Sequence, residues 1–167
     1  MSDFSRKNDL QIKQWIENHE VKKAFSAPLY RELLEERARR EESKSRLSVD
    51  RSLRILQEAA RLEQCTSYGD LAKASGVEWS KARLRMNGAG GHLDQLLDVC
   101  HVRGLPLLTA ICVNKSNVES GELDQNALTG FAVGARRLGY SFTDELGFHR
   151  AKRDECWAWG RGNAGGA

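Results

Sequence analysis

The sequence is short of the features that would assign it to several common protein classes. Only 2 of its 167 residues are proline, and 7% are aromatic. No run approaches the about 18 consecutive apolar residues that cross a bilayer as a helix. The first residues, MSDFSRKNDL, also lack the apolar stretch of a signal peptide. We therefore expect a cytoplasmic protein that has no membrane partner.

Closely spaced cysteines are also missing. The 4 cysteines include no Cys-x-x-Cys pair, so zinc-ribbon and thioredoxin-like sites are excluded. Scattered cysteines in a cytosolic chain are usually small buried hydrophobic residues. The 4 histidines are equally dispersed. We predict no metal ion, no cofactor and no catalytic residue.

Charge, by contrast, is abundant. Charged residues make up 29% of the chain, and the formal net charge is +3. Such a mild excess does not by itself indicate nucleic acid, so the distribution of the basic residues decides. Composition divides the chain into a charged helical extension (residues 1–47), a winged-helix-like domain (48–159) and a disordered tail (160–167).

The stretch TSYGDLAKASG, residues 66–76, carries the clearest local signal. Thr66 or Ser67 caps a short helix, with Asp70 in the position of a capping box, and Gly76 ends the helix in a left-handed turn. A second short segment, WSKARLRM at residues 79–86, follows at once. Two short helices joined by a turn that contains glycine are typical of a helix-turn-helix.

The neighbouring segments complete a winged-helix pattern. Ser48 caps a packing helix over 49–62, and amphipathic helices are expected over 28–44, 92–103 and 126–138. The run LLTAICV, residues 107–113, predicts a buried strand, and NKSNVESG predicts the tip of a hairpin that returns at 121–123. Thr143 is expected to cap a last helix that reaches about Trp159. The fold class is α+β and mostly helical: a winged helix-turn-helix-like core with an N-terminal helical extension and C-terminal helices.

Residues 66–76 resemble the helix-turn-helix entry of the alkylguanine DNA alkyltransferases and the alkyltransferase-like proteins. In that family the following helix enters the minor groove, and an arginine takes the place of a flipped base. The resemblance covers about residues 50–123. The family's reactive Pro-Cys-His-Arg is here Ile111-Cys112-Val113-Asn114. Because the activating histidine is missing, we expect no alkyl transfer, an ordinary thiol pKa and a buried strand position for Cys112.

A wider resemblance covers residues 50–159, where SYGDLAKASG, GLPLLTAICVNKSN and GFAVGARRLG follow one another. This order is similar to small uncharacterised domains that occur alone or beside restriction and other DNA-directed modules. The resemblance implies a DNA-related role, for example in a phage, a mobile element or a defence system. It supplies no catalytic residue.

The first functional hypothesis is therefore a non-enzymatic DNA-binding module. Its contacts would come from the second short helix and the wing, and phosphates would supply most of the affinity. The candidate DNA-binding residues are Lys73, Trp79, Lys81, Arg83, Arg85, Asn87 and Lys115. Within a helix, Lys81 and Arg85 share a face, whereas Arg83 points away.

Two alternatives remain open. The chain could be a protein-interaction factor, an inhibitor or adaptor that binds through residues 8–44 and through exposed tryptophans, because tryptophan is favoured at interface hot spots. It could also be a metal nuclease, which needs clustered carboxylates. The available carboxylates form no tight motif; they are Asp94, Asp98, Glu119, Glu122 and Asp124.

Overall fold

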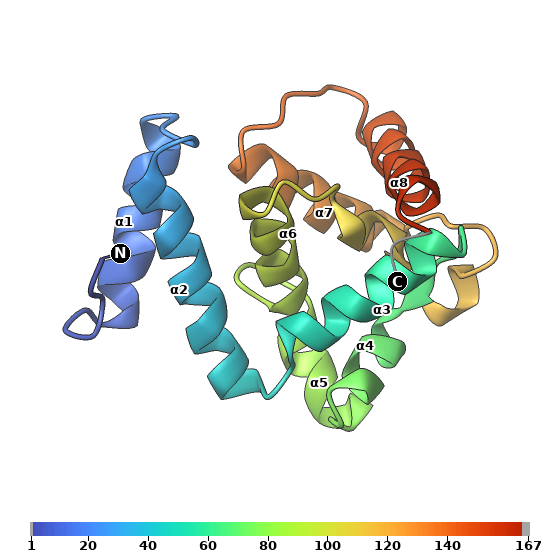
Figure 1. Ribbon diagram of the computed structural model, residues 1–167, viewed down its shortest axis with the longest axis horizontal. Helices are drawn as coiled ribbons and strands as arrows, with labels where there is room; N and C mark the ends of the chain where they lie inside the picture. The colour runs from blue at the N-terminus through green and yellow to red at the C-terminus, as the bar shows by residue number, and fades with distance from the viewer. Residues whose placement is uncertain (1, 165–167) are drawn as a thin grey trace.

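The computed structural model describes residues 2–164, which form a mostly helical protein with one very small sheet (Figure 1). The elements are α1 (Asp9–Val21), α2 (Pro28–Ser45), α3 (Val49–Arg61), β1 (Thr66–Ser67), α4 (Tyr68–Ala74), α5 (Trp79–Met86), α6 (His92–Val102), η1 (Leu108–Ile111), β2 (Cys112–Val113), η2 (Lys115–Asn117), α7 (Gln125–Arg137) and α8 (Glu145–Gly162). The prediction of a mostly helical α+β fold is confirmed.

Short polar residues begin several helices at the predicted positions. The Ser48 side chain accepts a hydrogen bond from the N–H of Arg51 at the start of α3, and Ser67 forms a capping box with Asp70 at the start of α4. The cap predicted for the last helix is displaced by one residue. Asp144, rather than Thr143, caps α8 by accepting from the N–H of Gly147 at 2.9 Å.

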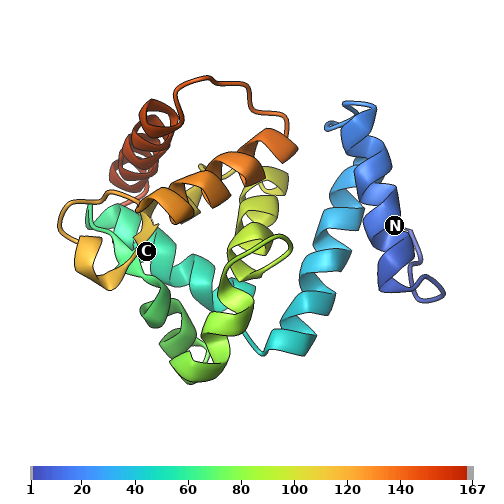
Figure 2. The same cartoon turned by 180° about the vertical axis from the view of Figure 1, so that it is seen from behind.

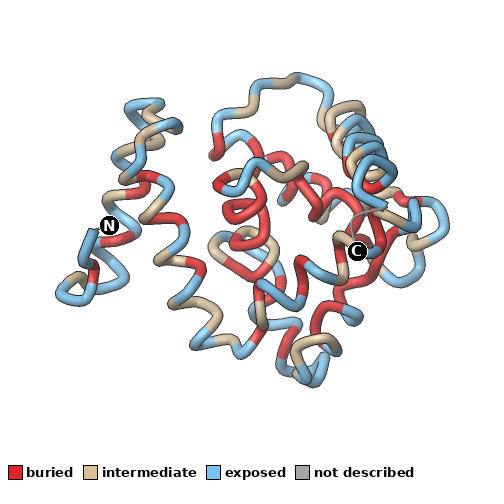
Figure 3. The backbone as a smooth tube through the Cα atoms, viewed as in Figure 1, coloured by how far each residue is buried: buried red, intermediate tan, exposed pale blue. Residues whose placement is uncertain are grey.

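The helices surround a core that is centred on α6 and the segment after it. α1 packs on α2, α2 packs along α6, and α3 packs on α8 and η1. Figures 1 and 2 show the α1–α2 hairpin at one side of the molecule and α8 at the other. In Figure 3 the buried positions gather on α6 and the chain beyond it, whereas much of α1 and α5 is exposed.

The predicted strand over residues 107–113 is wrong for most of its length. Residues Leu108–Ile111 form a 3₁₀ helix, and only Cys112 and Val113 pair, in parallel, with Thr66 and Ser67. All seven residues are buried. A run that is buried on every side carries no period, so the sequence cannot distinguish a strand from a tight helix.

The predicted wing is also wrong. Within residues 2–164 the only sheet is the parallel pair β1–β2, and residues 121–123 form no strand. α8 binds this segment instead: the Arg153 guanidinium donates to the carbonyl of Gly121 at 3.2 Å and to the Glu122 carboxylate at 3.1 Å. These contacts hold the chain against a helix, so it does not turn back beside β2.

The C-terminal region is more regular than predicted. α8 continues to Gly162, so residues 160–162 of the supposed disordered tail are helical. Gly160 allows this, because a Cβ there would lie 2.1 Å from the carbonyl oxygen of Ala60 on α3. The last part of the predicted tail, residues 165–167, lies outside the described residues.

Candidate nucleic-acid interface

The helix-turn-helix predicted at residues 66–86 is present as α4, a turn and α5. The Ser67 N–H donates to the Asp70 carboxylate at 3.1 Å, and the Asp70 N–H donates to the Ser67 hydroxyl at 3.2 Å. Gly76 takes a φ of +70°, which glycine adopts without strain, and the chain then turns into α5. The two local signals that predicted the unit therefore lie at the two ends of α4.

The helix α5 lies on the surface and buries only Ala82 and Met86. These two positions are one turn apart, so they form a single narrow stripe against the protein. All three cations, Lys81, Arg83 and Arg85, are therefore exposed. Arg83 still points away from Lys81 and Arg85, but the exposed face of this helix extends over most of its circumference and includes all three.

Apolar side chains stand among these cations. Leu84 is 78% exposed and Trp79 is 44% exposed. Among the ion pairs of residues 2–164, α5 contributes only Arg85, whose guanidinium lies 3.2 Å from the Glu41 carboxylate on α2. The cationic face is therefore neither buried in the protein nor neutralised as a whole.

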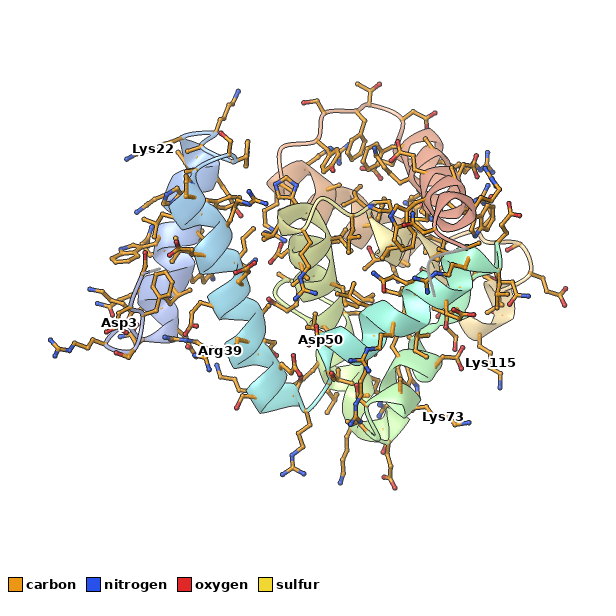
Figure 4. All side chains as sticks on the ribbon, in the orientation of Figure 1. Asp3, Lys22, Arg39, Asp50, Lys73 and Lys115 are labelled. Carbon is orange, nitrogen blue, oxygen red and sulfur yellow. The ribbon has the colours of Figure 1, made fainter. Side chains whose placement is uncertain are left out.

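The other candidate contacts lie around this helix. Asn87 is the C-cap of α5 and is exposed. Lys73 is exposed near the end of α4, and Lys115 is exposed on η2, the turn that replaces the wing. Figure 4 shows Lys73 and Lys115 projecting at the same margin of the molecule, away from Asp3 and Arg39 of the hairpin.

A cavity of about 550 Å³ opens beside the end of α5 and was not predicted from the sequence. Its walls come from the loop after α5, from α6 and α7, and from the β1–β2 region. The lining residues that matter below are Tyr68, Asn87, Ala89, Thr109, Cys112 and Phe131. The parallel pairing of β1 with β2 brings Tyr68 and Cys112 to one wall of the cavity. Because this pairing joins residues that are far apart in the chain, no local sequence signal predicts it.

Three polar side chains of this wall are almost completely buried. Tyr68 is 7% exposed, Thr109 is 5% exposed and Cys112 is 1% exposed. Among the described residues no hydrogen bond engages the Thr109 hydroxyl, which is itself shielded from solvent. Because a buried hydroxyl without a partner costs free energy, a ligand group that reached the Thr109 hydroxyl would gain a hydrogen bond there.

The thiol of Cys112 does not have the ordinary pKa expected from the sequence. Burial raises the pKa of Cys112 well above its usual value, and burial likewise raises the pKa of Tyr68. Both groups are therefore neutral near pH 7. The expectation that Cys112 is a buried strand residue is confirmed.

Three of the carboxylates considered for a nuclease serve structural roles. Asp98 is fully buried and is bound by Arg37 of α2 and Arg137 of α7. Glu122 pairs with Arg150 at 3.1 Å, and Asp124 caps α7. Residues 2–164 contain no group of three side chains arranged to hold a metal ion.

The tryptophans considered for a protein interface are less exposed than expected. Trp15, Trp157 and Trp159 pack partly against the core, and the Trp157 ring N–H donates to the carbonyl of Gln64 at 3.1 Å. Only Trp79, on α5, is exposed. The aromatic surface that remains free therefore belongs to the cationic helix.

Comparisons with protein-family models, with curated proteins and with solved structures gave no match. Over residues 2–164, no helix combines the length and the apolar character that a membrane crossing requires.

Proposed function

We propose that this chain is a non-enzymatic DNA-binding protein that places α5 against the backbone of a duplex. The observation that carries this proposal is the exposed face of α5, which combines Lys81, Arg83 and Arg85 with no carboxylate of its own. Phosphate neutralisation would supply the affinity. Trp79 and Leu84 would add apolar contact in a groove, as wedge residues do in minor-groove proteins.

The cavity adds a second part to the proposal, the binding of one unstacked base. Asn87 and Ala89, which follow α5 directly, line the cavity, so a nucleotide beside the helix has a short path into it. Pockets for flipped bases combine aromatic or apolar walls with hydrogen-bonding groups. Phe131, Tyr68 and Thr109 offer that combination, and the resemblance to the alkyltransferase-like proteins supports it. The raised pKa of Cys112 disfavours covalent transfer.

An electrophoretic shift experiment with random duplex and single-stranded DNA across a salt series tests the first part. We expect retention at low salt that falls steeply as salt rises. The triple variant Lys81→Glu, Arg83→Glu, Arg85→Glu should lose retention. The matched control is Arg6→Glu, Lys22→Glu, Lys23→Glu, which changes the net charge equally on exposed residues of the hairpin region. Equal loss in both variants, or no retention of the wild type, would refute the proposal.

Duplex DNA that carries 2-aminopurine at a mismatch tests the second part. Fluorescence of this base rises when it leaves the stack, so we expect a rise when the protein binds. Thr109→Val keeps the shape of the side chain and removes the hydroxyl. It should weaken the rise while leaving the salt dependence of binding intact. Binding without any fluorescence change would separate the cavity from DNA recognition.

A further inference from the structure

The chain that joins the hairpin to the rest of the protein touches the helix-turn-helix at two points. Glu41, near the end of α2, lies 3.2 Å from Arg85 of α5. Further along, the N–H of Ser48 donates to the hydroxyl of Ser75, the C-cap of α4, at 2.8 Å. Figure 1 shows the end of α2 turning into α3 next to α5. Residues 41–48 are therefore held beside the end of α4 and the end of α5.

Arg46 lies between these two contacts and has an unfavourable backbone conformation. Its φ is +61°, in the left-handed region. A residue with a Cβ pays about 1 kcal/mol there, and glycine pays almost nothing. The Arg46 side chain is exposed, and the ion pairs within residues 2–164 do not include it. Leu47, which is fully buried, fixes the chain directly after it.

We infer that Arg46 contacts a backbone phosphate of the DNA that α5 binds, and that Glu41 weakens the same interface by holding Arg85. The inference rests on the proposed function and adds the end of α2 to its site. A guanidinium binds a phosphate through two parallel hydrogen bonds, which suits an exposed arginine at this margin. The Glu41 carboxylate competes with phosphate for Arg85 and repels the phosphate itself.

Two single substitutions in the full chain test this inference with effects of opposite sign. Affinity for a duplex is measured by fluorescence anisotropy over a salt series. Arg46→Gly should lower the magnitude of the slope of log affinity against log salt by about one, the loss of one phosphate contact. Its melting temperature should stay equal or rise, because glycine relieves the left-handed strain. Glu41→Gln should increase both the affinity and the slope.

The matched control is Lys23→Gly. Lys23 is an exposed cation with a φ of +55°, so the substitution removes the same charge and the same strain. It follows α1 at the far end of the hairpin, where Figure 4 labels Lys22. We expect an unchanged slope for Lys23→Gly. Equal slopes for the two glycine variants, or an unchanged affinity for Glu41→Gln, would overturn the inference.

The outcomes separate this inference from the proposed function. If the wild type does not bind duplex DNA, both are refuted. If the wild type binds and the triple α5 variant does not, while Arg46→Gly behaves like the wild type, only the role of Arg46 is refuted. A fall in the slope for Arg46→Gly alone, at an unchanged melting temperature, supports the inference.

Discussion

The helices α2 and α5 are both rich in cations, and the protein uses these cations differently. α2 carries five basic residues and five glutamates, and α5 carries three basic residues and no acid. On α2, Arg40 pairs with Glu36 at 2.6 Å and with Asp9 at 2.9 Å. On α5, the ion pairs among residues 2–164 include only Arg85, and its partner is a glutamate of α2. Basic content alone therefore does not identify an interface; the position of the nearest carboxylates does.

The difference extends to burial. Arg37 of α2 reaches a fully buried carboxylate, Asp98, which Arg137 of α7 also binds. This network joins the N-terminal hairpin to α6 and α7. The cations of α5 are exposed, and within the described part of the chain no buried carboxylate binds them. We conclude that α2 uses its charges to hold the fold, whereas the charges of α5 remain available for the interface that we propose.

The largest expected effect comes from breaking the buried network. Asp98→Ala leaves Arg37 and Arg137 without their shared carboxylate, and such a loss costs about 3–5 kcal/mol of unfolding free energy. Urea denaturation measures it. Asp50→Ala is the control, because Asp50 forms an exposed pair with Arg103 at 3.5 Å and should cost less than about 1 kcal/mol. Similar losses of unfolding free energy in the two variants would contradict a structural role for the network.

A second prediction concerns the pH dependence of stability, which arises from a buried histidine of the core. Burial lowers the pKa of His92 to about 4, and its ring lies 2.8 Å from the Ser52 hydroxyl. The unfolded state, with a pKa of about 6.5, binds this proton more readily, so stability is intact above pH 6.5 and falls toward pH 4 by up to about 3 kcal/mol. Urea unfolding from pH 7 to pH 4.5 measures the fall. His92→Gln should flatten it, and an equally steep fall in that variant would refute this cause.

A third prediction compares the removal of one arginine from α5 with the removal of one arginine from α2. Arg83→Ala on α5 should change the unfolding free energy by less than about 0.5 kcal/mol and lower the salt slope of DNA binding by about one. Arg37→Ala on α2 should do the reverse, because it removes one partner of buried Asp98 at a cost of about 1–3 kcal/mol. Both variants are measured by urea unfolding and by anisotropy. A loss of stability in Arg83→Ala would contradict the comparison.

Helix boundaries and the helix-turn-helix could be predicted because their signals are local. Ser67 and Asp70 lie within one turn, and the left-handed Gly76 follows within the same segment. The segment 107–113 could not be predicted, because a fully buried run has no period and its only strand pairing is with the distant Thr66 and Ser67. The prediction of a wing was wrong for a similar reason, because Arg153 of α8 binds the carbonyl of Gly121, which lies far from it in the sequence.

Some features of the candidate site could likewise be predicted from the sequence, and others could not. The exposed cations of α5 follow from the sequence once the helix is recognised, and they were all named. The cavity was missed, because Tyr68, Thr109 and Phe131 come from three separate segments. The pairing of Arg85 with Glu41 was missed as well, because it depends on where the hairpin packs.

The smallest expected effect concerns a pair of α2 in which the Arg39 side chain is 71% exposed and the Glu36 side chain 13% exposed. Glu36→Gln removes the bidentate partner of Arg39, with bonds of 3.0 and 2.8 Å, and one partner of Arg40. A pair at the protein surface contributes about 0–1 kcal/mol, so the melting temperature should fall by no more than a few degrees. The salt slope of DNA binding should not change. A larger slope would mean that α2 also presents its cations to DNA.

The most direct test of the central claim is a map of backbone amide NMR shifts during titration with a short duplex at low salt. We predict that the shifts concentrate on α5, on the turn before it and on residues 87–89, and that α1 and the outer face of α8 stay unchanged. Shifts that gather on α1 or α8, with α5 unaffected, would contradict the claim that α5 presents its free cations to DNA.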